Sequence, residues 1–94
     1  MPFCTIVEFE WTETFDRGRF ADFIEHSGSG DSLPDGCMSR IGGIDDHGAR
    51  VIEVWRSGED ARRFAEQSAP SLARAQMPAP ARVMAFETST YLTA

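Results

Sequence analysis

The chain has 94 residues, with 15 acidic and 9 basic side chains and a net charge of -6 at pH 7. Such an acidic surface repels phosphate backbones and anionic lipid headgroups, so neither nucleic acid nor a membrane is expected as a partner. No run approaches the ~20 apolar residues of a membrane span. Glu8 and Glu10 stand where a signal peptide needs an apolar stretch, so a cytoplasmic location is expected. A chain of this length is expected to form one domain, which covers residues 1–94.

Cysteine and lysine usage narrows the chemistry further. Cys4 and Cys37 are too few for a disulfide scaffold and lack the spacing of a zinc site, so both are predicted to be free, buried thiols. All nine basic residues are Arg, which removes lysine Schiff-base chemistry. No metal or organic cofactor is expected.

The first half of the chain predicts a strand and a helix. Residues 3–11 alternate, with Phe3, Thr5, Val7, Phe9 and Trp11 on one face and Cys4, Ile6, Glu8 and Glu10 on the other. Asp16 is the expected N-cap of a helix that reaches about residue 26, with Phe15 packing on Phe20 as a hydrophobic staple. The buried stripe of that helix is predicted to be Phe20, Phe23 and Ile24.

The second half begins with turn-forming residues at 27–36, which predict a loop. Strands are expected at about 37–44 and 50–56, joined by a tight turn at 45–48 and therefore antiparallel. Ser57 caps a second helix, which Pro70 either ends or divides. A last strand is predicted over about 82–92.

This β-α-β-β-α-β order predicts an α+β fold, a ferredoxin-like sandwich. Its four-stranded antiparallel sheet has the order 4-1-3-2, with both helices on one face. Both faces of the first and third strands carry apolar side chains, so the uncovered face needs a second sheet. We therefore expect a homodimer, in the form of a dimeric α+β barrel. The sequence leaves open which set of the first strand, the one with Phe3 or the one with Cys4, is uncovered.

Residues 51–61, a strand that ends in Trp and runs into a Ser-capped acidic helix, resemble the antibiotic biosynthesis monooxygenase-like, dimeric α+β barrel superfamily. The resemblance covers nearly the whole chain. It implies one of several activities: cofactor-free oxygenation of aromatic polyketides, polyketide cyclisation, haem degradation or lactone isomerisation. Phe64 stands where members often carry a His, and the chain has no Asn, which argues against haem degradation.

Two residues on one face of the third strand are the principal candidates for a site. A carboxylate at Glu53 suits a general acid or base, and the alternative is an ion pair with Arg40 or Arg82. Trp55, two residues on, could stack on a flat ligand, and the alternative is a core residue. His26 and His47 belong to no spaced ligand set, and no serine has a patterned base.

The leading functional hypothesis is a cofactor-independent monooxygenase or cyclase that acts on an apolar, ring-containing metabolite. Its pocket would be lined by Phe20, Phe23, Trp55 and Phe64, with Glu53 as the catalytic group. The alternative is a non-catalytic dimeric accessory or ligand-binding protein whose cavity is filled by its own aromatic side chains.

Overall fold

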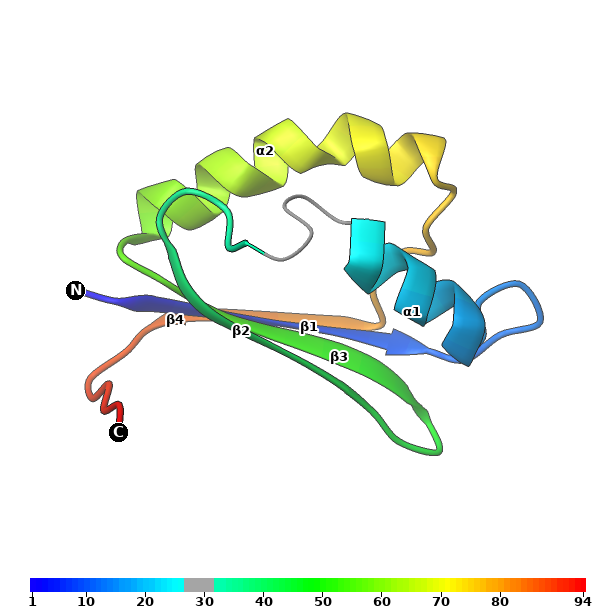
Figure 1. Cartoon of the computed structure of the whole chain (residues 1–94), viewed down its shortest axis with the longest axis horizontal. Coiled ribbons are helices and arrows are strands. Elements are labelled where there is room, and N and C mark those ends of the chain that lie inside the picture. Colours follow the sequence, from blue (N-terminus) through cyan, green and yellow to red (C-terminus); the bar gives the residue numbers. More distant parts are fainter. Residues whose placement is uncertain (27–31) are drawn as a thin grey trace.

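The computed structural model describes residues 1–26 and 32–94. The predicted order of elements is confirmed (Figure 1). Their bounds are β1 Phe3–Glu10, α1 Arg17–His26, β2 Cys37–Ile44, β3 Gly48–Trp55, α2 Gly58–Arg74 and β4 Arg82–Glu87. The loop predicted over residues 27–36 falls partly on residues 27–31, which lie outside the described residues.

The four strands form one antiparallel sheet in the order β2-β3-β1-β4, which is the predicted order. Both helices lie on the same side of this sheet (Figure 1). We call that side the helix side and the other the open side. The short turn between β2 and β3 is fixed by Asp45, whose Oδ1 accepts the backbone N–H groups of His47 at 2.8 Å and Gly48 at 3.0 Å.

Strand register assigns the two sides. Val7 of β1 pairs with Val51 of β3 and Val83 of β4, and directly paired residues point to the same side. Val7 packs against a buried cluster beneath α1, so its alternation set is on the helix side. The set that contains Cys4 and Ile6 therefore lies on the open side, which resolves what the sequence left undecided.

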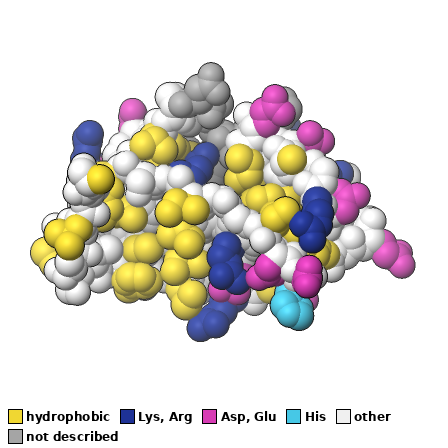
Figure 2. Space-filling model, turned by 60° about the horizontal axis from the view of Figure 1, so that its bottom comes forward, with side chains coloured by type: hydrophobic (Ala, Val, Ile, Leu, Met, Phe, Trp, Pro, Cys, Tyr) yellow, Lys and Arg dark blue, Asp and Glu magenta, His cyan; other side chains and the backbone are white. Residues whose placement is uncertain are grey.

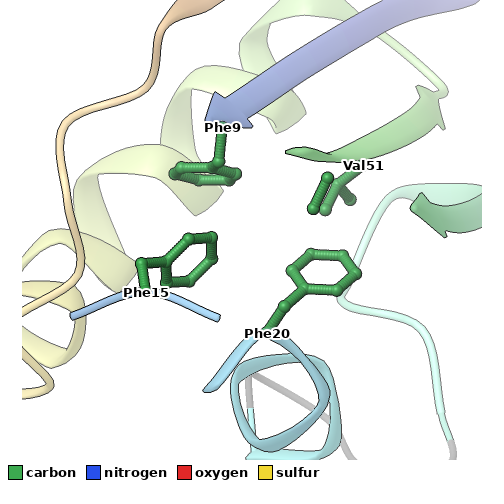
Figure 3. Close-up of a cluster of buried hydrophobic side chains, with 5 residues drawn as sticks. Phe9, Phe15, Phe20 and Val51 are labelled. Carbon is green, nitrogen blue, oxygen red and sulfur yellow. The ribbon is translucent and has the colours of Figure 1, made fainter. Parts of the chain in front are cut away.

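The larger core cluster lies at the α1 end of the sheet, and we call it the Phe9 cluster (Figure 3). Phe15 is only 1% exposed, and its ring meets Phe20 edge-on at 6.3 Å, as the predicted staple requires. Asp16 Oδ1 accepts the Arg19 backbone N–H at 2.9 Å, which confirms the predicted cap. The buried members are Phe9, Phe15, Phe20, Ala49 and Val51.

A smaller core cluster, the Trp55 cluster, lies where β3 runs into α2. Its buried members are Cys37, Trp55 and Ala61, with Phe3 and Phe64 packed against them. Ser57 accepts the Asp60 backbone N–H at 3.2 Å and so starts α2 directly above this cluster. The helix cap thus sets the position of Phe64 over the sheet.

Helix α2 continues through Pro70, so the predicted break there is wrong. A proline removes one backbone donor, but the following turn still closes, because Ala75 donates its N–H to Ser71 O at 3.0 Å. The helix ends instead at a tight C-terminal turn, in which Gln76 has a φ of 55° and Met77 N–H reaches Leu72 O at 3.2 Å.

Strand β4 is shorter than the predicted 82–92. Its partner β1 begins at Phe3, and the last contact of the ladder is Thr88, whose backbone N–H donates to Pro2 O at 2.9 Å. Proline has no backbone N–H, so it cannot donate a hydrogen bond back to β4, and the ladder stops there. The alternating pattern beyond residue 88 therefore has no neighbouring strand among residues 1–26 and 32–94.

Candidate functional site

A single polar row crosses the helix side of the sheet. Arg40 of β2 pairs with Glu53 of β3, and Glu53 pairs with Thr5 of β1. On β1, β2 and β3 the rows on either side are apolar apart from glycine, and the exposed Glu87 of β4 stands at the level of Phe3. Buried polar groups are therefore concentrated at one level of the sheet. Side chains paired in this way have Cβ atoms about 4.5–5.5 Å apart, which puts the three groups within reach of one small molecule.

Arg40 and Glu53 form an ion pair that is mostly buried. The guanidinium donates from Nε at 2.9 Å and from Nη2 at 2.7 Å, both to Oε2 of the carboxylate. The two side chains are 15% and 11% exposed. The predicted alternative of an ion pair with Arg40 is thereby confirmed. Within the described residues Oε1 accepts no hydrogen bond, and both hydrogen bonds from Arg40 are accepted by Oε2.

Phe64 links the ion pair to Trp55. The guanidinium carbon of Arg40 lies 5.9 Å from the Phe64 ring centroid, and the rings of Phe64 and Trp55 are 5.3 Å apart and tilted by 38°. Trp55 is 1% exposed, and its Nε1–H donates to Thr5 Oγ1 at 3.2 Å. A ligand over the polar row would therefore meet Phe64 and Thr5 before it met the indole.

The structure brings together three of the five residues expected at the site, namely Glu53, Trp55 and Phe64. Phe20 and Phe23 lie in the Phe9 cluster, where their rings are 6.4 Å apart. A Cβ built on Gly42 would lie 3.9 Å from the tip of the Phe20 ring. Phe20 is thus next to the polar row, since Gly42 is two residues from Arg40 on β2, but it packs mainly against other core rings.

The helix side of β4 is open to solvent. Val83, which pairs with Val7, is 60% exposed, and Ala85, which pairs with Thr5, is exposed too. Thr5 and Val7 are themselves half-buried. The β4 end of this level of the sheet is therefore more exposed than the Arg40–Glu53 pair, whose side chains are 15% and 11% exposed.

Sequence reasoning did not single out Thr5, Val83 or Ala85. The signal for Thr5 was present, because it is a hydroxyl residue within the otherwise apolar stripe of Phe3, Val7 and Phe9. Val83 and Ala85 needed the register, since alternation alone does not tell which side of an edge strand a helix covers.

Two surface hollows lie away from the polar row. One, of about 390 Å³, is lined by Trp11 and the first turn of α1, where the Arg17 guanidinium carbon sits 5.7 Å from the Trp11 ring centroid. The other, of about 250 Å³, lies beside the β2–β3 turn. Among residues 1–26 and 32–94 no three His, Cys, Asp or Glu side chains gather in a way that could hold a metal ion.

The two cysteines are free thiols, as predicted, and they occupy opposite sides of the sheet. Cys4 lies on the open side, and Cys37 packs against Trp55 on the helix side. Burial raises the pKa of both thiols, and the Glu53 carboxylate raises that of Cys37 further.

The fold and the polar row define a ferredoxin-like α+β domain with a mostly buried ion pair between two strands, on the side of the sheet that the helices cover. The chain is similar to a solved structure from Chloroflexus aurantiacus J-10-fl, described as a provisional antibiotic biosynthesis monooxygenase. The two share 20% sequence identity over 99% of this chain and 98% of that one, with a TM-score of 0.70. The expected likeness to antibiotic biosynthesis monooxygenase-like proteins is thus confirmed at the level of the fold. No protein-family model and no curated protein matches the sequence.

No helix in the described part of the chain is long and apolar enough to cross a membrane.

Proposed function

We propose that this protein is a cofactor-independent monooxygenase or cyclase that acts on an apolar, ring-containing, polyketide-like metabolite, with Glu53 as its base. The observation that carries the proposal is the Arg40–Glu53 ion pair, which is buried next to aromatic rings yet leaves one carboxylate oxygen without a hydrogen bond from the described residues. A carboxylate in such a position can accept a proton from a bound carbon acid.

The proposed chemistry starts with that proton. Glu53 Oε1 takes it from a ring carbon whose anion is conjugated with a carbonyl group, and the substrate becomes an electron-rich enolate. In oxygenation, a ring CH₂ group supplies the four electrons that reduce O₂ to a new ring carbonyl oxygen and one water molecule. In cyclisation, the enolate carbon attacks a second carbonyl of the same molecule, and the alkoxide recovers the proton.

Aromatic and aliphatic side chains around the ion pair favour a flat, apolar substrate. Phe64 and the exposed side chains of Val83 and Ala85 offer apolar surface beside the polar row. Removing such surface from water contributes roughly 25 cal/mol per Å². Phe64 would form one wall of the site with Trp55 packed behind it, and Phe20 and Phe23 would support that wall from the Phe9 cluster.

The protein is further proposed to be a homodimer that pairs the open sides of two sheets. That side carries apolar side chains from all four strands, and Figure 2 shows hydrophobic groups gathered over it. Phe86 is 47% exposed there and Ile41 61%, which is costly to leave in water. The apolar members are Cys4, Ile6, Ile41, Ile52, Val54, Met84 and Phe86. A reducing cytoplasm would keep Cys4 and Cys37 as thiols.

The second candidate is a non-catalytic accessory or ligand-binding dimer. It is favoured by the burial of Trp55, which is 1% exposed and stacked on Phe64, because the ring then fills space that a ligand would use.

Turnover and binding of one probe separate these two candidates. Anthrone, a flat ring ketone with an acidic CH₂ group, would be converted to anthraquinone with uptake of one O₂ and release of one water. Glu53→Gln keeps the shape and removes the base, so we expect retained binding with at least a hundredfold loss of turnover.

The matched control is Glu87→Gln, which removes a carboxylate from the exposed end of β4 and should leave the rate unchanged. Normal turnover by Glu53→Gln contradicts the role of Glu53. Tight binding with no chemistry in wild type favours the accessory protein.

A further inference from the structure

Thr5 belongs to the polar row but has no role in the chemistry proposed above. It is half-buried on β1, next to Glu53 across the ladder with β3 and next to Ala85 across the ladder with β4. Its hydroxyl is thus the polar group of the row that lies nearest the solvent-open edge. A molecule that entered over Ala85 would reach Thr5 first and Glu53 second.

The hydroxyl of Thr5 accepts a hydrogen bond from Trp55 and has a hydrogen left to donate. A threonine hydroxyl has one hydrogen to donate and two lone pairs to accept with. The Trp55 indole N–H, at 3.2 Å, uses one lone pair. Within residues 1–26 and 32–94 the hydroxyl hydrogen itself meets no acceptor. Because the indole can only donate, the hydroxyl hydrogen points away from the indole and is left to bond another acceptor.

We infer that Thr5 is the hydrogen-bond donor that holds an oxygen atom of the ligand, and that Trp55 is the positioning residue that orients the Thr5 hydroxyl. The inference rests on the proposed function, since it concerns the same ligand site. The ligand then carries a carbonyl or phenolate oxygen toward Thr5, with its reacting carbon toward Glu53. Threonine holds the oxygen, and the carboxylate takes the proton from the ring carbon that is conjugated with it.

This division of labour explains why Trp55 is buried. Its ring stacks on Phe64 and is 1% exposed, so it is poorly placed to contact a ligand. Its single polar atom nevertheless reaches Thr5. Trp55 then acts through Thr5, and β-branching at Thr5 restricts the hydroxyl to few rotamers. The arrangement is held before a ligand arrives, which lowers the entropic cost of binding.

A pair of probes that differ only in the oxygen tests the inference. Anthrone has a ring carbonyl, and 9,10-dihydroanthracene is the same three-ring compound without it. Affinities for both would be measured by calorimetry in the absence of O₂. One hydrogen bond is worth about 0.5–1.5 kcal/mol, so wild type should bind anthrone up to about tenfold more tightly.

Thr5→Val keeps the shape but removes the hydroxyl, so the ratio of the two affinities should fall to about one while dihydroanthracene binds as before. Thr5→Ser keeps the hydroxyl and should restore the preference. Ala85→Leu fills the approach from β4 and should weaken both compounds alike. An unchanged ratio in Thr5→Val overturns the inference.

The outcomes separate the inference from the proposed function. If both compounds bind wild type equally, Thr5 is not the donor, but the ligand site stands. If neither compound binds, the ligand site and the inference both fail.

Discussion

The two sides of the sheet differ in one respect that bears on function. The helix side has a polar row, Arg40, Glu53 and Thr5, between rows that are apolar on the three strands that carry it, whereas the middle of the open side is apolar across all four strands. Burying polar groups costs free energy unless they are paired, so a polar row under helices needs a reason. An apolar open side needs only a second apolar surface that removes it from water. This difference between the two sides underlies both proposals, a ligand site on the helix side and self-association through the open side.

The largest expected effect is loss of the proposed dimer when a charge is placed on the open side. Ile41 and Ile44 are on the same strand, 61% and 51% exposed, and point to the open and the helix side respectively. Ile41→Asp would bury an unpaired charge between two sheets, which costs several kcal/mol and weakens association roughly a thousandfold. Ile44→Asp should not.

Light scattering after size exclusion measures both variants. Wild type and Ile44→Asp should give about twice the 10.4 kDa mass of the chain, and Ile41→Asp about one chain mass. Monomeric wild type at micromolar concentration contradicts the dimer, and a dimeric Ile41→Asp places its interface elsewhere.

The next largest effect is on stability, and it tests the ion pair on the helix side. Arg40→Met removes one partner of a mostly buried ion pair and leaves Glu53 uncompensated, which typically costs about 3–5 kcal/mol. The double variant Arg40→Met with Glu53→Leu removes both charges and should recover most of that stability. Urea unfolding of the two single variants, the double variant and wild type forms a complete cycle. A small cost in Arg40→Met would show that the pair is well solvated.

The two sides also show which features of the fold and the site could be predicted from the sequence. Alternation and caps predicted the element order, the sheet order and the shared face of Glu53 and Trp55, because these depend on local periodicity. The separation of Phe20 and Phe23 from Trp55 depends on where α1 crosses the sheet. Local patterns do not carry that information. The exposed helix side of β4 and the end of its ladder near Pro2 likewise depend on strand register.

The smallest effect compares the two thiols. Burial raises the pKa of Cys4 and Cys37, so at pH 8 the folded protein holds less thiolate than the unfolded chain and iodoacetamide should react slowly. The rate should rise as the pH climbs through the raised pKa. Ile41→Asp should speed alkylation of Cys4, which shares the open side, and leave Cys37 unchanged. Equal acceleration of both would mean that the variant loosens the whole fold.

One measurement tests the proposed roles of the two sides most directly, namely methyl NMR of the protein during titration with anthrone in the absence of O₂. The account predicts shifted resonances for Val7, Val83 and Ala85, which line the helix side near Thr5. Ile41 and Ile52 on the open side should stay unchanged. Shifts confined to the two isoleucines would place the ligand on the open side and contradict the account.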